Sequence, residues 1–557
     1  VIGVFFLALI GIIVWVVRQK QNDSADYFLG GRDATWLAIG ASIFASNIGS
    51  EHLIGLAGAG ASSGMAMAHW EIQGWMILIL GWVFVPFYTR SMVYTMPEFL
   101  ERRYNPQSRT ILSVISLVSY VLTKVAVTVY AGGLVFQQVF GIKELWGIDF
   151  FWIAAIGLVV LTALYTIFGG MKSVLYTSVL QTPILLLGSL IILVLGFKEL
   201  GGWDEMMRVC GAVTVNDYGD TMTNLIRSND DANFPWLGAL IGSAIIGFWY
   251  WCTDQFIVQR VLSGKNEMEA RRGTIFGAYL KLLPVFLFLI PGMIAFALHQ
   301  KYIGAGGEGF LPMLANGTAN ADAAFPTLVA KLLPAGVKGL VVCGILAALM
   351  SSLASLFNSS AMLFTIDFYK RFRPETPEKK LVGIGQVATV VIVILGILWI
   401  PIMRSVGDVL YTYLQDVQSV LAPGIAAAFL LGICWKRTSA QGGMWGLIAG
   451  MVIGLTRLGA KVYYSNAGEV ADSTFKYLFY DMNWLFFCGW MFLFCIIVVI
   501  VVSLATKAPT AEKIQGLVFG TATKEQKAAT RASWNHWDII HTVIILAITG
   551  AFYWYFW

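Results

Sequence analysis

Long apolar runs recur along the whole chain, and almost every polar stretch between them is short. Because a helix of about 20 apolar residues crosses a bilayer, windows of about 19 residues predict about fourteen membrane spans. The pattern predicts an all-α integral membrane protein. The predicted spans lie near residues 1–17, 35–61, 65–89, 109–140, 150–168, 173–197, 236–261, 273–300, 336–366, 380–402, 408–433, 438–457, 482–505 and 537–557.

Two of these spans carry polar residues in their middle. The second contains Asn47, Glu51 and His52 within the glycine-rich stretch 41–58, and the seventh contains Asp254 and Gln255. Buried charge and freed backbone are tolerated at membrane depth only where they line a protein-walled cavity. We therefore expect a broken helix at a binding site in each.

The two interrupted spans each begin a group of five spans, residues 35–197 and 236–433. Interrupted helices at matching positions of two halves are typical of transporters built from inverted repeats, with the site near the midplane. The sequence predicts five parts: a peripheral first helix and loop (1–32), a first five-helix repeat (33–198), an outer loop (199–235), a second inverted repeat (236–433) and three peripheral helices (434–557).

Composition and charge support a membrane location. The chain is 58% hydrophobic and only 12% charged, about half the usual charged share of ~25%. Its net charge of +5 arises from basic loops, which stay in the cytoplasm, so it does not indicate nucleic acid. We expect a multi-pass protein of the cell (plasma or inner) membrane with both termini extracytoplasmic. The basic loops follow the first, third and ninth spans and occupy 506–535.

Five motifs resemble those of the sodium/glucose cotransporters of the solute:sodium symporter family, and the chain is similar to a bacterial-type member. They are Ala45-Ser-Asn-Ile-Gly-Ser, Thr95-Met-Pro-Glu-Phe, Tyr165-Thr-Ile-Phe-Gly-Gly, Trp249-Tyr-Trp-Cys-Thr-Asp-Gln followed by Val258-Gln-Arg, and Ala348-Leu-Met-Ser-Ser-Leu-Ala-Ser-Leu-Phe-Asn-Ser. The resemblance implies fourteen helices with a five-plus-five inverted repeat, a leucine-transporter-like fold, and alternating access coupled to sodium.

Glu71 and Lys281 are ionisable side chains inside apolar spans. Each costs at least ~2.5 kcal/mol at the bilayer centre if left alone, so we expect both to face the bundle interior. A purely structural ion pair is one interpretation. The resemblance instead places both among sugar-contacting residues. A carboxylate and an ammonium together would form an electrically balanced pocket suited to an uncharged polyol.

The resemblance adds further substrate contacts. An amide or imidazole within a span is more often helix-to-helix glue, and aromatic residues usually pack, so these residue types alone do not define a site. Gln73 stands where the sequence departs from related proteins, as does Gly247. Tyr250 is also expected to gate the cytoplasmic side. The additional predicted contacts are Asn47, His52, Gln73, Tyr250, Trp251 and Gln415.

By the same resemblance, the hydroxyls of Ser351 and Ser352 and the carbonyls of Ala45, Ile48 and Ala348 match a sodium site. Sodium takes oxygen ligands, and a broken helix supplies free carbonyls. Serine pairs in membrane helices are otherwise common packing residues that bond to the preceding turn.

Some relatives hold a second sodium on an acid in a Tyr-Thr-Asp motif. Here the motif reads Tyr176-Thr-Ser, and Ala354 replaces one candidate hydroxyl while Ser355 remains. Without the carboxylate a second cation lacks its counter-charge. We therefore expect one sodium for each transported sugar.

The sequence thus predicts a sodium-coupled importer of a neutral hexose such as glucose or galactose, with no obligate protein partner. Alternatives are transport of inositol or another solute, or a sensor or leak channel on the same fold. An enzyme is disfavoured because no metal cluster or nucleophile–base arrangement accompanies Glu71. Asp254 and Arg260 are expected to form a structural or gating pair.

Overall fold

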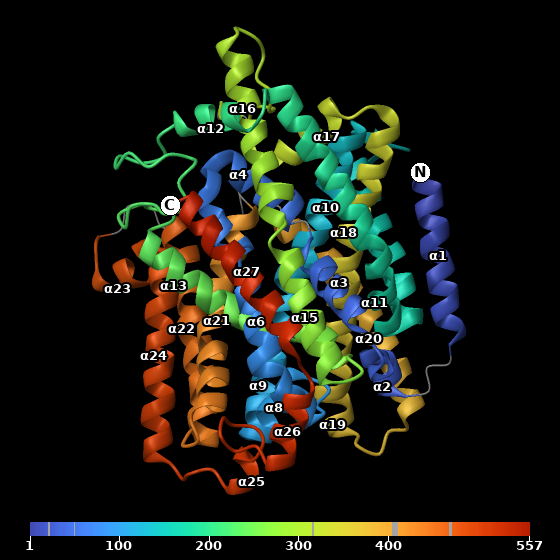
Figure 1. Ribbon diagram of the computed structural model, residues 1–557, viewed down its shortest axis with the longest axis vertical. Coiled ribbons are helices and arrows are strands. Elements are labelled where there is room, and N and C mark those ends of the chain that lie inside the picture. The colour runs from blue at the N-terminus through green and yellow to red at the C-terminus, as the bar shows by residue number, and fades with distance from the viewer. Residues whose placement is uncertain (20–22, 50, 315–316, 404–409, 467–470) are drawn as a thin grey trace.

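The computed structural model describes residues 1–19, 23–49, 51–314, 317–403, 410–466 and 471–557. Figure 1 shows an upright bundle of helices. The α-helices are α1 (Ile2–Arg18), α2 (Ser24–Leu29), α3 (Trp36–Asn47), α4 (Ala57–Ser63), α5 (Ala68–Glu71), α6 (Gly74–Ile79), α7 (Val85–Ser91), α8 (Met96–Arg103), α9 (Pro106–Ser119), α10 (Ala126–Phe140), α11 (Phe150–Leu200), α12 (Trp203–Gly211), α13 (Trp236–Gly247), α14 (Gln255–Leu262), α15 (Glu267–Lys281), α16 (Ile290–Gly304), α17 (Ala324–Leu332), α18 (Ala335–Met362), α19 (Lys370–Phe372), α20 (Glu378–Met403), α21 (Leu410–Cys434), α22 (Ala440–Asn466), α23 (Thr474–Lys476), α24 (Trp484–Ala505), α25 (Ala511–Ile514), α26 (Lys524–Ala532) and α27 (His536–Tyr555).

Short π-helical and 3₁₀ turns and one small hairpin complete the fold. The π-helical turns are η2 (Glu51–Leu56), η4 (Leu80–Phe84), η5 (Tyr120–Val125), η6 (Phe248–Thr253), η7 (Val285–Leu289), η9 (Leu363–Tyr369) and η10 (Tyr477–Asp481), and the 3₁₀ turns are η1 (Gly30–Arg32), η3 (Gly64–Met67) and η8 (Ala321–Ala323). Strands β1 (Glu144–Leu145) and β2 (Ile148–Asp149) pair antiparallel.

Among the described residues, ten helical segments are long and apolar enough to cross a membrane, and three further apolar helices are shorter. The predicted spans 150–168 and 173–197 lie in one helical segment, α11, which Gly170 interrupts at φ +53° and ψ −149°. Glycine adopts this conformation without strain. The predicted count of fourteen spans stays a prediction.

Both predicted interruptions are present. α3 ends at Asn47 and the chain resumes as η2, while η6 and α14 meet at the extended residue Asp254. The first interruption lies against α18, a helix of small and hydroxyl residues that is buried from Val341 to Met362 apart from Leu346. Small residues allow such close helix packing at membrane depth.

The two halves also touch backbone to backbone. A Cβ built at Gly60 of α4 would lie 2.2 Å from the Leu289 carbonyl, and one at Gly292 of α16 would lie 1.9 Å from the Ala57 carbonyl. Only glycine permits this approach. The contact fixes η2 and α4, and thus the segment after the first interruption, against the second half of the bundle.

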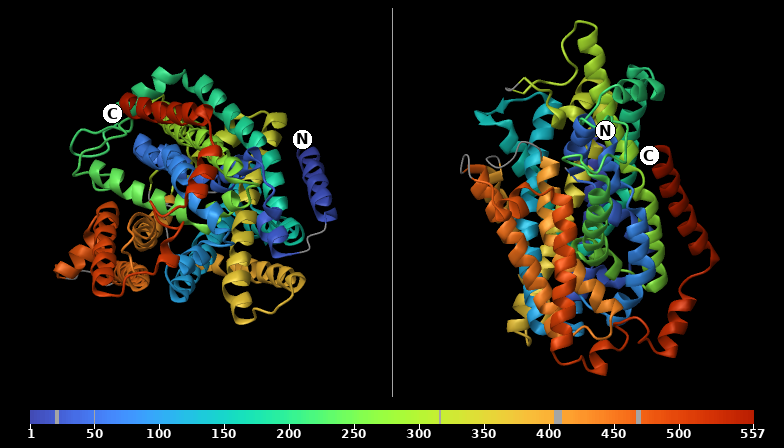
Figure 2. Two further views of the ribbon diagram at one scale, coloured as in Figure 1. Left: turned by 60° about the horizontal axis from the view of Figure 1, so that its bottom comes forward. Right: turned by 90° about the vertical axis from the view of Figure 1, so that its left-hand side faces the viewer.

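The periphery differs from this centre. Apolar side chains of α24 and α27, such as Trp490, Val501 and Val543, are more than half exposed, as expected where a helix faces lipid. Both termini lie toward the end that carries α12, and α19, α25 and α26 lie at the opposite end (Figures 1 and 2). The basic segments 370–380 and 506–535 therefore share one end of the bundle.

Candidate functional site

The end of α3 places Asn47 between two other helices. At Ile48 the backbone leaves the helix (φ −79°, ψ 105°), and Gly49 follows. The Asn47 side chain accepts a hydrogen bond from Lys281 Nζ at 3.1 Å and donates one to Tyr250 Oη, also at 3.1 Å. Its amide thus links the first half of the bundle to α15 and η6 in the second.

Glu71 and Lys281 form a buried ion pair. Their atoms Oε2 and Nζ are 2.6 Å apart, and the residues are only 2% and 3% exposed. His52 Nε2 lies 3.2 Å from the same carboxylate oxygen. A charge buried without a partner is strongly unfavourable. The Glu71–Lys281 ion pair can therefore separate only if a solute replaces its hydrogen bonds; otherwise the two side chains must move together.

Gln73 and Gly247 fit each other sterically. Gln73 Nε2 donates to the Ser243 carbonyl at 2.8 Å, and its Oε1 accepts from Trp251 Nε1 at 3.3 Å. A Cβ built at Gly247 would lie only 2.4 Å from Gln73 Oε1. The two departures noted in the sequence are therefore coupled, because the amide occupies the space that a side chain at 247 would need.

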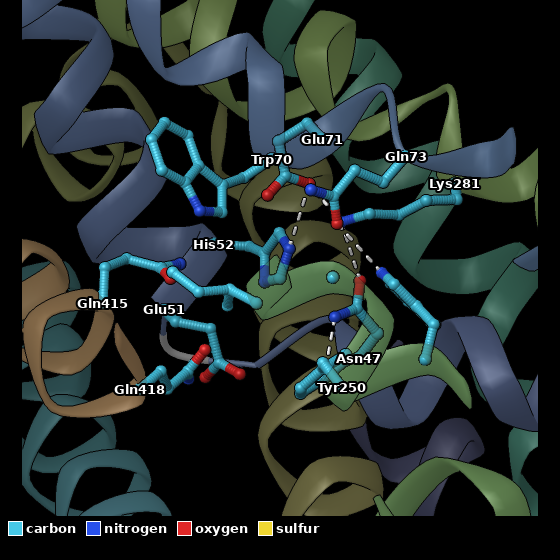
Figure 3. Close-up of a pocket in the computed structure, with 13 residues that line it drawn as sticks. Asn47, Glu51, His52, Trp70, Glu71, Gln73, Tyr250, Lys281, Gln415 and Gln418 are labelled. Atoms are coloured by element: carbon cyan, nitrogen blue, oxygen red, sulfur yellow. Dashed lines mark hydrogen bonds and ion pairs between the residues drawn. The ribbon is translucent and has the colours of Figure 1, made fainter. Parts of the chain in front are cut away.

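All eight side chains predicted to contact the solute line one cavity of about 50 Å³ (Figure 3). Sites for small-molecule ligands usually measure about 300–1,000 Å³. The cavity must therefore widen before it can hold a sugar. It is also lined by residues that sequence reasoning did not assign, namely Glu51, Trp70, Ile246, Gly247 and Gln418.

Several polar atoms of the cavity lining are buried without hydrogen bonds in the described chain. They include the Nε1 of Trp70, which can only donate, and two atoms of predicted solute contacts, the Nδ1 of His52 and the Oε1 of Gln415. Buried polar atoms normally have partners. Since the imidazole can donate or accept and the amide oxygen only accepts, both suit hydroxyl groups, which do both.

The predicted sodium ligands lie where α3 meets α18. Ser46 Oγ and Ser355 Oγ are 2.6 Å apart, and Ser178 Oγ lies 3.3 Å from Ser351 Oγ. Ser352 Oγ lies 3.0 Å from a Cβ built at Gly49. The structure thus brings the serine pair of α18 beside the interruption of α3.

Free backbone oxygens are found at the same place. Within the described part of the chain, no hydrogen bond reaches the carbonyl of Ala45 or Ile48. The carbonyl of Ala348 lies inside α18. Carbonyls and hydroxyls are the hard oxygen ligands that sodium takes.

Glu51 lies between the solute cavity and the predicted sodium ligands. It lines the cavity, and its Oε2 lies 2.7 Å from the Cβ built at Gly49, the same point that Ser352 Oγ approaches. The sequence already indicated a role for Glu51, because it is a charged residue in the interrupted segment, next to His52. The cavity therefore carries one negative charge more than the Glu71–Lys281 pair alone would give it.

A second buried cluster lies around the other interruption. Lys124 Nζ is 2.6 Å from Asp254 Oδ2, and Tyr120 donates a hydrogen bond to Asp254 Oδ1. The expected direct ion pair of Asp254 with Arg260 is not found among the described residues, although the two charges still attract each other. Arg260 donates instead to the Phe256 carbonyl, because its guanidinium turns back along α14.

Comparison with known proteins gives consistent results. The model of the sodium:solute symporter family matches residues 27–450. Sodium/myo-inositol cotransporter 2 of Homo sapiens is 36% identical over 535 residues, covering 94% of this chain and 78% of that protein. Sodium/myo-inositol cotransporter of Canis lupus familiaris is 37% identical over 544 residues, covering 93% and 74%.

A solved structure shares the fold. A Na⁺-coupled sialic acid symporter in a substrate-bound outward-open state superposes with a TM-score of 0.72 at 22% sequence identity, covering 91% of this chain and 98% of that chain. The likeness confirms the predicted fold class, a leucine-transporter-like bundle with broken helices.

Proposed function

The chain belongs to the sodium:solute symporter family, and from this premise we propose that it imports a neutral cyclic polyol together with sodium by alternating access. It is a multi-pass membrane protein and a sodium-coupled solute symporter, not an enzyme. The proposed cargo is a hexose such as glucose or galactose. Inositol is the second candidate, because the relatives at 36–37% identity are named as myo-inositol cotransporters.

The observation that carries the proposal is the set of groups around the cavity. An ammonium, two carboxylates, an imidazole and amides converge there, and the aromatic side chains of Tyr250 and Trp251 adjoin them. Hydroxyl groups can both accept from the ammonium and donate to the carboxylates. An anionic solute would meet surplus negative charge from Glu51 and is disfavoured.

The proposed solute site is Asn47, His52, Glu71, Gln73, Tyr250, Trp251, Lys281 and Gln415, with Glu51 and Gln418 added from the cavity lining. A solute that enters must widen the cavity and compete with the Lys281–Asn47 and Lys281–Glu71 hydrogen bonds. Tyr250, held by Asn47, is proposed as the barrier on the cytoplasmic side.

The proposed sodium ligands are Ala45, Ile48, Ala348, Ser351 and Ser352. Sodium bound there would offset the charge of Glu51 and fix the end of α3. Because Asn47 lies on that end and bonds Lys281, ordering it would prepare the solute site. Coupling of this kind requires that sodium bind the solute-competent state more tightly than the other state.

One sodium per solute remains the proposal. Ser178 donates its hydroxyl to the Val174 carbonyl at 2.6 Å and pairs with Ser351, so it contributes no negative charge for a second cation. One sodium falling through 100 mV releases about 2.3 kcal/mol, enough for more than a tenfold solute gradient.

The orientation in the membrane is proposed from the positions of the basic segments. We assign the end with α19, α25 and α26 to the cytoplasm and both termini to the outside of the cell (plasma or inner) membrane. Residues 33–198 and 236–433 are proposed as the inverted repeats, 199–235 as an outer loop, and 1–32 and 434–557 as peripheral.

The test is uptake into proteoliposomes of purified protein with labelled glucose, galactose and myo-inositol. The proposal expects accumulation of at least one of them above equilibrium, only with an inward sodium gradient. Equilibration without accumulation would indicate a leak channel. Tight binding with no flux would indicate a sensor.

A further inference from the structure

A groove on the outer surface is lined almost wholly by apolar side chains. It has a volume of about 660 Å³ and lies between α20 on one side, α9 and η5 on the other, and η9 at its base. Ligand sites usually measure about 300–1,000 Å³. Its walls include Val118, Phe364, Val387 and Val391, which are between 42% and 63% exposed.

The groove is as long as one leaflet of a bilayer is thick. Its lining on α20 runs from Ile384 to Leu395, which at 1.5 Å per residue is about 16 Å. The hydrocarbon core of a whole bilayer is about 30 Å. The length of the groove therefore matches the hydrocarbon part of one leaflet.

Basic side chains stand at one end of the groove, on both walls. On α20, Lys380 precedes the lining residues Ile384 and Val387 by four and seven positions, so it shares their face. On α9, Thr110 and Val114 continue the face of Val118 in the same direction.

Arg371 is the second cation and lies beside the α9 wall of the groove. Its guanidinium donates hydrogen bonds to Thr110 Oγ1 and to the Pro106 carbonyl, the latter at 3.3 Å. Lys380 makes no hydrogen bond or ion pair with another described side chain, and neither residue has a carboxylate partner in that part of the chain. Two unneutralised cations thus flank the groove where its apolar lining stops.

We propose that the groove binds one acyl chain of an anionic glycerophospholipid, whose phosphate is held between Lys380 and Arg371. The apolar lining alone would accept the chain of any lipid. The cations favour a lipid with net negative charge, because long basic side chains reach the headgroup level and attract anionic lipids. The leaflet concerned is the one at the α19 end, which we assign to the cytoplasm.

Native mass spectrometry of the purified, delipidated full chain tests the charge requirement. Phosphatidylglycerol and phosphatidylcholine with identical acyl chains are titrated in turn. We expect tighter binding of phosphatidylglycerol, and a loss of about fivefold for each of Lys380→Gln and Arg371→Gln, since a basic residue near the surface contributes about 1 kcal/mol. Equal binding of the two lipids by the unaltered protein would overturn the proposal.

A matched control separates a site from general attraction. Lys524→Gln with Lys527→Gln removes two exposed charges of α26 at the same end of the bundle and should leave the preference intact. If the control variant loses the preference for phosphatidylglycerol as fully as Lys380→Gln or Arg371→Gln does, the attraction is not specific to the groove. The proposed site is then refuted.

Filling the groove tests the acyl chain. Val391→Trp, at a position 49% exposed, should lower binding of both lipids, whereas Val452→Trp on α22, 53% exposed, should not. Glycerol 1-phosphate, which has the headgroup but no chain, should fail to compete. Retained lipid binding in Val391→Trp, or competition by glycerol 1-phosphate, would contradict the proposal.

Discussion

The two interruptions of membrane helices differ in how their backbone groups are satisfied. α3 ends at Asn47, where the Ile48 amide donates back to the Phe44 carbonyl, and the carbonyls of Ala45 and Ile48 accept no hydrogen bond from the described residues. At the other interruption, Asp254 caps α14 by accepting from the Phe256 amide, and Tyr120 and Lys124 bind its carboxylate. The first interruption is open to a ligand, and the second is closed by the protein itself.

The difference shows that an interrupted helix is not by itself a binding site. A helix end leaves polar backbone groups without partners. At the second interruption the carboxylate of Asp254 satisfies the helix end. Its partner Lys124 is in turn held among four aromatic rings, whose centroids lie 4.7–5.4 Å from Nζ. Where no such group is supplied, backbone carbonyls remain without donors among the described residues, as the proposed sodium site requires.

The largest effect is expected for Lys281→Ala, which should lower sodium-driven uptake more than a hundredfold. It removes the ammonium that is proposed to donate to the solute and takes from the buried Glu71 carboxylate its Lys281 partner, a loss of about 3–5 kcal/mol. Uptake in proteoliposomes measures it, with monodispersity of the purified variant checked first. Lys301→Ala, which affects only a lysine bonded to the Leu200 carbonyl, should keep uptake. Normal uptake by folded Lys281→Ala would remove this lysine from the site.

Asp254→Asn should lower the free energy of unfolding in detergent by about 3 kcal/mol, because Lys124 loses its carboxylate partner and is left as a buried charge. Adding Lys124→Met should recover much of the loss, since the unpaired charge is then gone. A denaturation series of the two single variants and the double variant measures this. An unchanged midpoint in Asp254→Asn would show that the second interruption is not closed in the way described.

Ser352→Ala should raise the sodium concentration for half-maximal uptake by about tenfold, equivalent to about 1.4 kcal/mol. The variant loses one hydroxyl oxygen beside the open interruption. Ser360→Ala serves as the control, because it removes another buried hydroxyl of the same helix, one with no partner in the described chain. Equal sodium activation in Ser352→Ala and wild type would refute the placement of the ion.

Glu51→Gln should raise the same half-maximal sodium concentration by about threefold to fivefold. The change keeps the shape of the side chain and removes a negative charge near Gly49 and Ser352. A cation about 4 Å away would gain about 1 kcal/mol from that charge in a water-filled cavity, where the dielectric is close to that of bulk water. The salt dependence of uptake at constant ionic strength measures it. An unaltered sodium curve would mean that the carboxylate does not sense the ion.

Much of this arrangement could be predicted from the sequence. Asn47, Glu71 and Lys281 are polar groups in apolar spans, and the cost of burying them alone requires that they face inward. The glycines and polar residues of 41–58 likewise predict the interruption that the structure shows.

The remaining features depend on which helices lie side by side. The sequence suggested only Arg260 as the partner of Asp254, and the packing of η5 against α14 brings Lys124 to it instead. The steric match of Gln73 and Gly247, 174 positions apart, is invisible to local patterns. Gln418 joins the cavity because it lies one turn beyond Gln415 on α21.

The most direct test of the central claim is the charge moved per solute accumulated by purified wild-type protein under an inward sodium gradient. The account, with one open interruption beside a polyol cavity, predicts accumulation of a neutral hexose or inositol with one positive charge for each molecule. Accumulation without sodium, or two charges per molecule, would contradict it.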